Sequence, residues 1–399
     1  MKSRRSLVIV QVPPYPPTGG VALRNWQTIN LLRQQGEVAI FSIYKGQDVS
    51  SAALQARGIE VGHFDIGQPQ RPYLEKIKNR LAPLRRDGYR YTDWLYTTAA
   101  GQALDAFIKD FRPSLIVFEE LWLYGYLKVV LPYAGTTGCA LVLDNHNIEG
   151  SKEAYRSGSD RRRLQRIRHI EERFTRQVDQ TWVCSPNDRA QLQELYPSSG
   201  RAEIVPNGLD NRFYQPARAA RSHQNSDRLL FLGKFSYQPN EEAALIAMGE
   251  IMPLLKKQRP QLWLVGRDPT DAMAQAAKEV SDVHITGLVD DVRPYLSRAR
   301  VMVVPLQQGG GTRLKILEAF AAGCPVVSTP KGAEGLAVQA GVHLRLGNSP
   351  AELAAHIEDL WQHSAEAQAM AERAHQLFEQ TYAWTAVSQR LSQALAALG

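Results

Sequence analysis

The sequence has few cysteines and no long hydrophobic run. Its three cysteines, Cys139, Cys184 and Cys324, are far apart and odd in number. They support neither a disulfide framework nor a CxxC metal site, and they fit a reducing, cytoplasmic compartment. No apolar run approaches the roughly 18 residues of a membrane-spanning helix. Prolines rather than small residues follow the apolar run Leu7–Val12, which therefore predicts a first buried strand and not a signal peptide.

Positive charge is unevenly distributed over the 399 residues, whose formal net charge is +7. Residues 1–210 hold 28 Lys and Arg against 22 Asp and Glu, which is nearly all of the surplus. Much of this surplus of positive charge lies in residues 71–90 and 156–176. Such segments are solvated helix faces or contacts to an anionic membrane or a phosphate-bearing acceptor. No groove-reading or base-stacking module is recognisable, so nucleic acid is not an expected partner.

Short apolar runs alternate with helical stretches along the whole chain. Buried strands separated by helices predict a parallel sheet covered on both faces, as in doubly wound α/β folds. A polar, turn-rich stretch at 207–228 is predicted to be a linker. The sequence therefore predicts two domains, residues 1–206 and 229–379, with ligand in the cleft between them.

A glycine-rich loop is the most informative motif. Residues 305–313 follow an expected strand and open an expected helix, so the loop offers backbone N–H groups at the positive end of a helix dipole, where phosphate binds. The alternative is a simple chain reversal, although consecutive glycines are entropically costly unless the backbone must approach a ligand. The predicted ligand contacts are Gly309, Gly310, Gly311, Thr312, Arg313, Leu314 and Glu318.

Two single residues follow expected strands at the edge where such sheets bind ligands. Lys234 comes directly after Gly233 and is predicted to contact phosphate, the alternative being a solvated surface charge. His146 follows the strand expected at 140–143, and its side chain suits proton exchange near neutrality. A structural turn is the alternative for His146.

Glu119 and Glu120 follow another expected strand. Paired carboxylates can perform glycoside hydrolysis, and they can equally mark the start of a helix. Nothing in the sequence fixes their separation.

Five segments together resemble the retaining GT-B glycosyltransferases of family GT4. Residues 317–327 (LEAFAAGCPVV) are similar to the second half of that family's donor signature, E-x7-E followed by LEAxAxGxPVV. The other four segments are PPTGG at 16–20, IVPNGLD at 204–210, LFLGK at 230–234 and ITGLV at 285–289.

The resemblance implies a role for each matching residue. Glu318 would hold the ribose, while Gly310 stands where the family has its first Glu, which contacts the donor sugar. A family lysine is replaced at Asn240, and Arg313 is expected to supply that charge. His146 would contact the donor sugar. The remaining implied contacts are to the diphosphate or nucleobase, from Gly20, Gly233, Lys234, Leu288 and Val289.

The resemblance implies a GT-B fold of two Rossmann-like domains, with a C-terminal helix at about 380–399 that packs back on the first. The expected function is transfer of a hexose-type sugar from a UDP- or GDP-linked donor to an acceptor hydroxyl with retention, in glycan, glycolipid or polysaccharide biosynthesis. No cofactor and no metal are expected. The expected location is cytoplasmic, with the inner face of the membrane as one option. A nucleotide-sugar 2-epimerase and an inactive nucleotide-sugar-binding protein stay open as alternatives, the latter because of Gly310.

Overall fold

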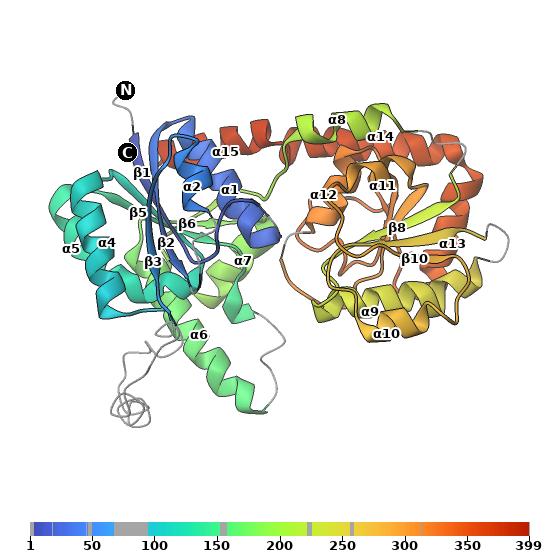
Figure 1. The fold of residues 1–399 in the computed structure, drawn as a ribbon, viewed down its shortest axis with the longest axis horizontal. Helices are drawn as coiled ribbons and strands as arrows, with labels where there is room; N and C mark the ends of the chain where they lie inside the picture. The colour runs from blue at the N-terminus through green and yellow to red at the C-terminus, as the bar shows by residue number, and fades with distance from the viewer. Residues whose placement is uncertain are drawn as a thin grey trace. The chain divides into compact units, whose positions relative to one another are not determined.

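The structure is a computed structural model that describes residues 4–17, 19–44, 46, 50–67, 95–151, 158–221, 226–255, 259–311 and 313–398. The basic segment 71–90 and Thr312 lie outside the described residues. The chain divides into two compact units (Figure 1). The first unit runs to Pro206 and resumes at Ser388, and the second is Asn207–Val387. Each unit is built on a parallel sheet flanked by helices, which confirms the predicted fold class.

The first unit has a seven-stranded sheet in the order β3-β2-β1-β4-β5-β6-β7. In Figure 1, α4 and α5 lie on one side of this sheet and α1 and α2 on the other. Because both faces are covered, Leu7–Val10 of β1 are fully buried. The strands are β1 (Arg4–Val10), β2 (Gly36–Tyr44), β3 (Glu60–Asp65), β4 (Leu115–Glu119), β5 (Ala140–Asn145), β6 (Gln180–Val183) and β7 (Arg201–Ile204). The helices are α1 (Gly20–Arg33), α2 (Ser51–Gln55), α4 (Thr98–Phe111), α5 (Leu127–Thr137), α6 (Gly158–Gln177) and α7 (Pro186–Leu195).

The second unit has a six-stranded sheet in the order β10-β9-β8-β11-β12-β13. Figure 1 shows α9 and α10 on one side of it and α8, α11 and α14 on the other. The strands are β8 (Arg228–Leu232), β9 (Gln261–Val265), β10 (Val283–Ile285), β11 (Val301–Val304), β12 (Val326–Ser328) and β13 (Arg345–Leu346). The helices are α8 (Asn211–Ala219), α9 (Gln238–Ile246), α10 (Asp271–Ala276), α11 (Arg293–Arg298), α12 (Leu314–Ala321), α13 (Pro350–Gln362) and α14 (Ser364–Thr381).

The strand order reverses beside the first strand of each sheet. In the first unit β2 and β4 flank β1, and in the second β9 and β11 flank β8. Loops that leave such neighbouring strands in opposite directions open a crevice at the carboxyl edge of the sheet. The segments after β4, β8 and β11 all carry residues that the sequence singles out, so the topology brings them to these edges.

Two elements differ from the sequence-based predictions. The predicted linker contains α8, whose Tyr214 and Ala217 are buried in the second unit because the polar stretch has an apolar face at helical spacing. The sequence pattern over 240–258 predicts one continuous helix, but α9 ends at Ile246 and continues as a π-helical turn over Ala247–Ile251.

The last helix in the described part of the chain is α15 (Trp384–Ala396). Its residues from Ser388 onward belong to the first unit. There the Gln180 amide donates to the Ala394 carbonyl at 2.8 Å. Among the described residues, we find no helix long and apolar enough to cross a membrane.

Candidate active site

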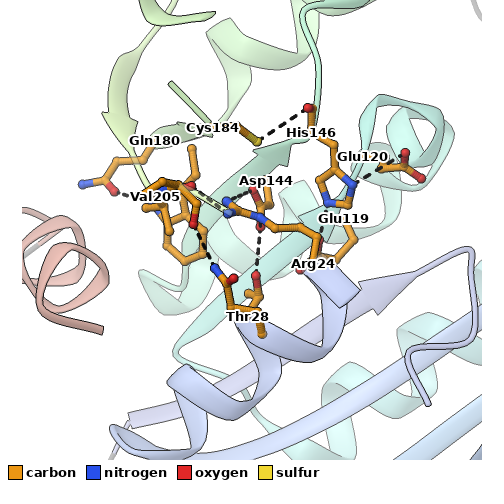
Figure 2. A network of polar contacts seen from close by, with 12 residues as sticks. Arg24, Thr28, Glu119, Glu120, Asp144, His146, Gln180, Cys184 and Val205 are labelled. Carbon is orange, nitrogen blue, oxygen red and sulfur yellow. Dashed lines mark hydrogen bonds and ion pairs between the residues drawn. The ribbon is translucent and has the colours of Figure 1, made fainter. Parts of the chain in front are cut away.

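A polar cluster lies at the carboxyl ends of β4 and β5 in the first unit (Figure 2). The parallel register sets Glu119 opposite Asp144, and His146 follows two residues later. All three side chains are buried. Adjacent strands thus bring together two segments that lie 25 residues apart in the register of the sheet and that no local sequence pattern connects.

Asp144 is held by α1. The Arg24 guanidinium donates to both carboxylate oxygens, at 3.0 Å from Nε and 2.7 Å from Nη2. The Thr28 hydroxyl donates to Oδ2 at 3.0 Å, and a further Arg24 nitrogen donates to the Val205 carbonyl at 2.7 Å. Arg24 and Asp144 are at most 2% exposed. A buried ion pair in which both partners are hydrogen-bonded fixes geometry strongly, because removing either partner leaves an uncompensated charge.

His146 lies between two carboxyl groups. Its Nε2 is 2.7 Å from Glu119 Oε2, and its Nδ1 is 3.7 Å from Glu120 Oε1. Burial raises the pKa of Glu119 well above its ordinary value, and the charge of Asp144 adds to this effect. Burial also lowers the pKa of His146. Both shifts favour the uncharged forms of Glu119 and His146.

Glu120 has a strained backbone. Its φ of 78° and ψ of 153° fall in a region that glycine occupies almost alone. Such a conformation costs about 1–3 kcal/mol and is concentrated at active sites and ligand clamps. Here it directs the Glu120 carboxylate toward His146 instead of along the strand. The two carboxyl groups are therefore partners of one imidazole.

Glu171 on α6 holds the loop that carries His146. Its carboxylate accepts from Asn145 Nδ2 at 2.9 Å and from the backbone N–H groups of Glu149 and Gly150 at 3.0 and 2.8 Å. The Tyr196 hydroxyl also donates to it, at 2.7 Å. In the sequence, Glu171 is one acidic residue within the basic segment 156–176.

The residues of the cluster do not fit a metal ion. Glu119, Asp144 and His146 each have a ligand atom within 4.8 Å of the others. Both Asp144 oxygens, however, are occupied by Arg24, whose positive charge opposes a cation at this point. The arrangement is an acid–base network.

The second candidate region lies at the carboxyl end of β8. Gly233 directly follows β8. A Cβ added to it would lie 3.1 Å from the Asn240 amide, so the backbone passes close to α9 here. Lys234 has a half-exposed side chain, and its ammonium lies 3.8 Å from Asp268. The position is the ligand edge expected from the sequence.

The glycine-rich loop wraps around Arg313. The guanidinium donates to the carbonyls of Gly309 at 2.8 Å, Gly310 at 3.2 Å and Lys331 at 3.0 Å. Because C=O and N–H point in opposite directions across a trans peptide, the N–H groups of Gly310 and Gly311 are turned away from Arg313. Gly309 and Gly311 have φ of 102° and 83°, which explains glycine at both positions. The buried guanidinium of Arg313 is thus committed to shaping the loop, unlike the free phosphate-binding cation of the prediction.

Two further side chains on α12 complete this region. Glu318 accepts from the Tyr214 hydroxyl at 3.0 Å, and burial raises its pKa to about 7. Lys315 donates to Asn240 Oδ1 at 2.7 Å. Burial, assisted by the charge of Arg313, lowers the pKa of Lys315 to about 7.

Other predicted contacts are placed as follows. Leu288 is 75% exposed on the loop after β10, and Val289 is partly buried beside it. Gly20 is the first residue of α1, and Leu314 is the first of α12. Both units therefore present their predicted residues on loops and helix starts.

Comparisons with known proteins agree with this architecture. The profile of Glycosyl transferases group 1 matches residues 226–363, and that of Glycosyltransferase Family 4 matches residues 51–213. The chain belongs to glycosyltransferase family 4. This confirms the resemblance inferred from the sequence, and together the two matches cover most of the chain. No curated protein sequence matches it.

Solved structures of other glycosyltransferases share the fold. Anabaena HepE, in complex with UDP and glucose, is 17% identical over 99% of this chain and 100% of its own, with a TM-score of 0.70. Sucrose-phosphate synthase from Thermosynechococcus elongatus is 16% identical over 99% of both chains, with a TM-score of 0.71. WaaG, involved in lipopolysaccharide biosynthesis, is 15% identical over 98% and 99%, with a TM-score of 0.64. These likenesses confirm the GT-B class.

Four important residues escaped the sequence analysis: Arg24, Glu171, Tyr214 and Lys315. One of them had a visible signal. Ile167, Ile170 and Phe174 form an apolar stripe on α6 at helical spacing, and Glu171 falls inside that stripe. A carboxylate on a buried helix face requires hydrogen-bond donors, so the pattern alone predicts a structural anchor.

Proposed function

We propose that this family 4 enzyme transfers a hexose-type sugar from a nucleoside diphosphate donor to an acceptor hydroxyl with retention of configuration. The main support for this proposal is the carboxyl edge of the second sheet. There, Gly233–Lys234 and the Gly309–Arg313 loop follow the neighbouring strands β8 and β11. That edge combines outward N–H groups, an exposed cation and a partly buried carboxylate. These are the groups needed for a diphosphate and a ribose.

Each residue has a defined part in the proposal. The N–H groups of Gly310 and Gly311 and the ammonium of Lys234 bind the diphosphate. Glu318 accepts hydrogen bonds from the ribose hydroxyls, with Tyr214 fixing its orientation. Leu288 and Val289 cover the nucleobase.

His146 retains the role that the family resemblance implies, at the donor sugar. Because Glu119 fixes its ring at 2.7 Å, the imidazole is oriented before any ligand arrives. In the reaction, the sugar C1 exchanges its bond to the diphosphate oxygen for a bond to the acceptor oxygen, and the acceptor proton ends on the diphosphate. Fixed cations and N–H groups stabilise that leaving group, so the proposal requires neither a metal nor a cofactor.

For the acceptor, the proposal extends only to its chemical class. The surplus of positive charge in the first half of the sequence favours a lipid-linked or phosphate-bearing acceptor at an anionic membrane surface. Among the described residues, α6 is locally basic, with seven Arg against three Asp and Glu. A biosynthetic role in glycolipid or polysaccharide assembly would follow from such an acceptor.

The experiment is a thermal-shift screen with UDP-, GDP- and ADP-linked hexoses, followed by product analysis. A ligand that binds only the native state raises the melting temperature. At a concentration one hundred times Kd it adds about 2.7 kcal/mol to the free energy of unfolding. We expect a shift with one nucleotide class and sugar release that depends on an added acceptor. Formation of an epimerised sugar nucleotide without acceptor would establish the 2-epimerase instead, and binding without any turnover would establish the inactive binding protein.

A further inference from the structure

Lys315 joins the two loops of the second unit's ligand edge. It lies in the first turn of α12, directly after the glycine-rich loop. Its ammonium is 2.7 Å from Asn240 Oδ1, and the Asn240 amide in turn donates to the Lys234 carbonyl at 2.9 Å. A single chain of contacts therefore runs from α12 through α9 to the end of β8.

The position is unfavourable for a cation in the absence of a ligand. The first turn of a helix is the positive end of its dipole, which repels a positive charge. The two contacts given to the Lys315 ammonium are uncharged, namely the Asn240 oxygen and the ring of Phe231, whose centroid is 4.1 Å away. Among the described residues no carboxylate forms an ion pair with it. An anion that arrives here gains an ion pair without having to break one.

The two neighbouring cations, Arg313 and Lys234, have other contacts. Arg313 is occupied by three carbonyls and approaches Glu334 at 3.6 Å, while Lys234 lies half-exposed beside Asp268. The family lysine expected at position 240 is an asparagine here, and the cation that reaches this asparagine comes from α12.

We propose that Lys315 is a diphosphate-binding residue of the donor site and that Asn240 aims its ammonium. The proposal rests on the function proposed above and replaces Arg313 with Lys315 as the source of the second positive charge. On binding, a diphosphate oxygen becomes the anionic partner of Nζ, and Asn240 keeps one hydrogen bond to it. Lys315 then determines affinity for the diphosphate and not for the nucleoside.

The test measures binding of UDP, GDP, ADP, uridine and inorganic pyrophosphate to Lys315→Met by titration calorimetry. Methionine keeps the apolar stem and removes the charge. A charge-assisted contact of this kind corresponds to about a tenfold to hundredfold change in Kd. We expect that loss for the nucleoside diphosphate and for pyrophosphate, with unchanged nucleoside affinity. Lys278→Met, at an exposed lysine that contacts Gln275 within the same unit, is the matched control and is expected to bind as the wild type.

A charge exchange separates binding from packing. In Asn240→Lys/Lys315→Asn the cation is delivered from α9 across the same contact, and we expect it to recover most of the lost affinity. Unchanged diphosphate affinity in Lys315→Met would overturn the proposal, as would an equal loss for nucleoside and diphosphate together with a lowered melting temperature. Failure of the wild type to bind any nucleotide or pyrophosphate would overturn the proposed function itself, which is a different result.

Discussion

In the first unit, two pairs of ionisable groups meet beside the carboxyl ends of β4 and β5: Arg24 with Asp144, and Glu119 with His146. In the second unit, Lys315 and Glu318 face an amide oxygen, an aromatic ring and a tyrosine hydroxyl. The first cluster is complete by itself, and its geometry is fixed before any ligand binds. In the second, Lys315 has no ion pair among the described residues, and the proposed diphosphate would supply one. Variants of the two clusters should therefore respond differently: stability should fall in the first, and ligand affinity in the second.

The largest expected effect is on stability, from Arg24→Met. Asp144 is then buried without its cation, and breaking such a pair costs about 3–5 kcal/mol. Urea denaturation measures the loss. Arg5→Met is the matched control, because its ion pair with Glu37 is 39% and 54% exposed and contributes at most about 1 kcal/mol. Equal losses in both variants would show that the cluster of the first unit is not held by its ion pair.

Glu171→Gln should cost less and should separate activity from donor binding. The new NH₂ group faces N–H donors of the 149–150 backbone, and such a mismatch costs about 1–3 kcal/mol. The His146 loop is then released, so turnover should fall while nucleotide affinity is unchanged. Glu172→Gln is the control, since Glu172 lies 4.0 Å from Arg176 on the exposed side of the same helix. A variant that keeps full turnover would remove Glu171 from the positioning of His146.

The strained backbone at Glu120 predicts that a glycine substitution is more stable than an alanine substitution. Glycine accepts the φ of 78° without a Cβ penalty, so Glu120→Gly should be more stable than Glu120→Ala by about 1–3 kcal/mol. Both variants lack the carboxylate and should lose turnover alike. Chemical denaturation of the pair isolates the backbone contribution, and equal stability would mean that the backbone at this position relaxes freely.

The smallest expected effect is a pH slope in the second unit. The pKa of Glu318 is about 7 in the folded protein, above its ordinary value of about 4.5, so the folded state holds a proton that the unfolded state has released. Its contribution to stability is present below pH 4.5 and is lost as pH rises through about 7. Glu318→Gln should therefore flatten the fall in stability across this window. A wild-type profile identical to that of the variant would place Glu318 in a water-exposed setting.

The sequence predicted the buried strands and the glycine-rich loop at 305–313 because those features are local. A buried parallel strand is an apolar run, and three glycines in a row require a reason. The roles of Arg313 and Lys315 depend on tertiary contacts 18 and 75 residues away, with Lys331 and Asn240. No local pattern distinguishes a guanidinium that holds a loop from one that binds phosphate. The helix in the predicted linker was obscured by its polar composition, although Tyr214 and Ala217 carry a helical spacing.

Titration calorimetry of the wild type with UDP, GDP and ADP, with and without EDTA, is the most direct test of the central claim. That claim is a nucleoside diphosphate site on the second unit, built from backbone N–H groups and protein cations. It predicts saturable one-site binding of one of the three nucleotides with the same Kd in both buffers. Absence of binding by all three, or binding that EDTA abolishes and Mg²⁺ or Mn²⁺ restores, would contradict it.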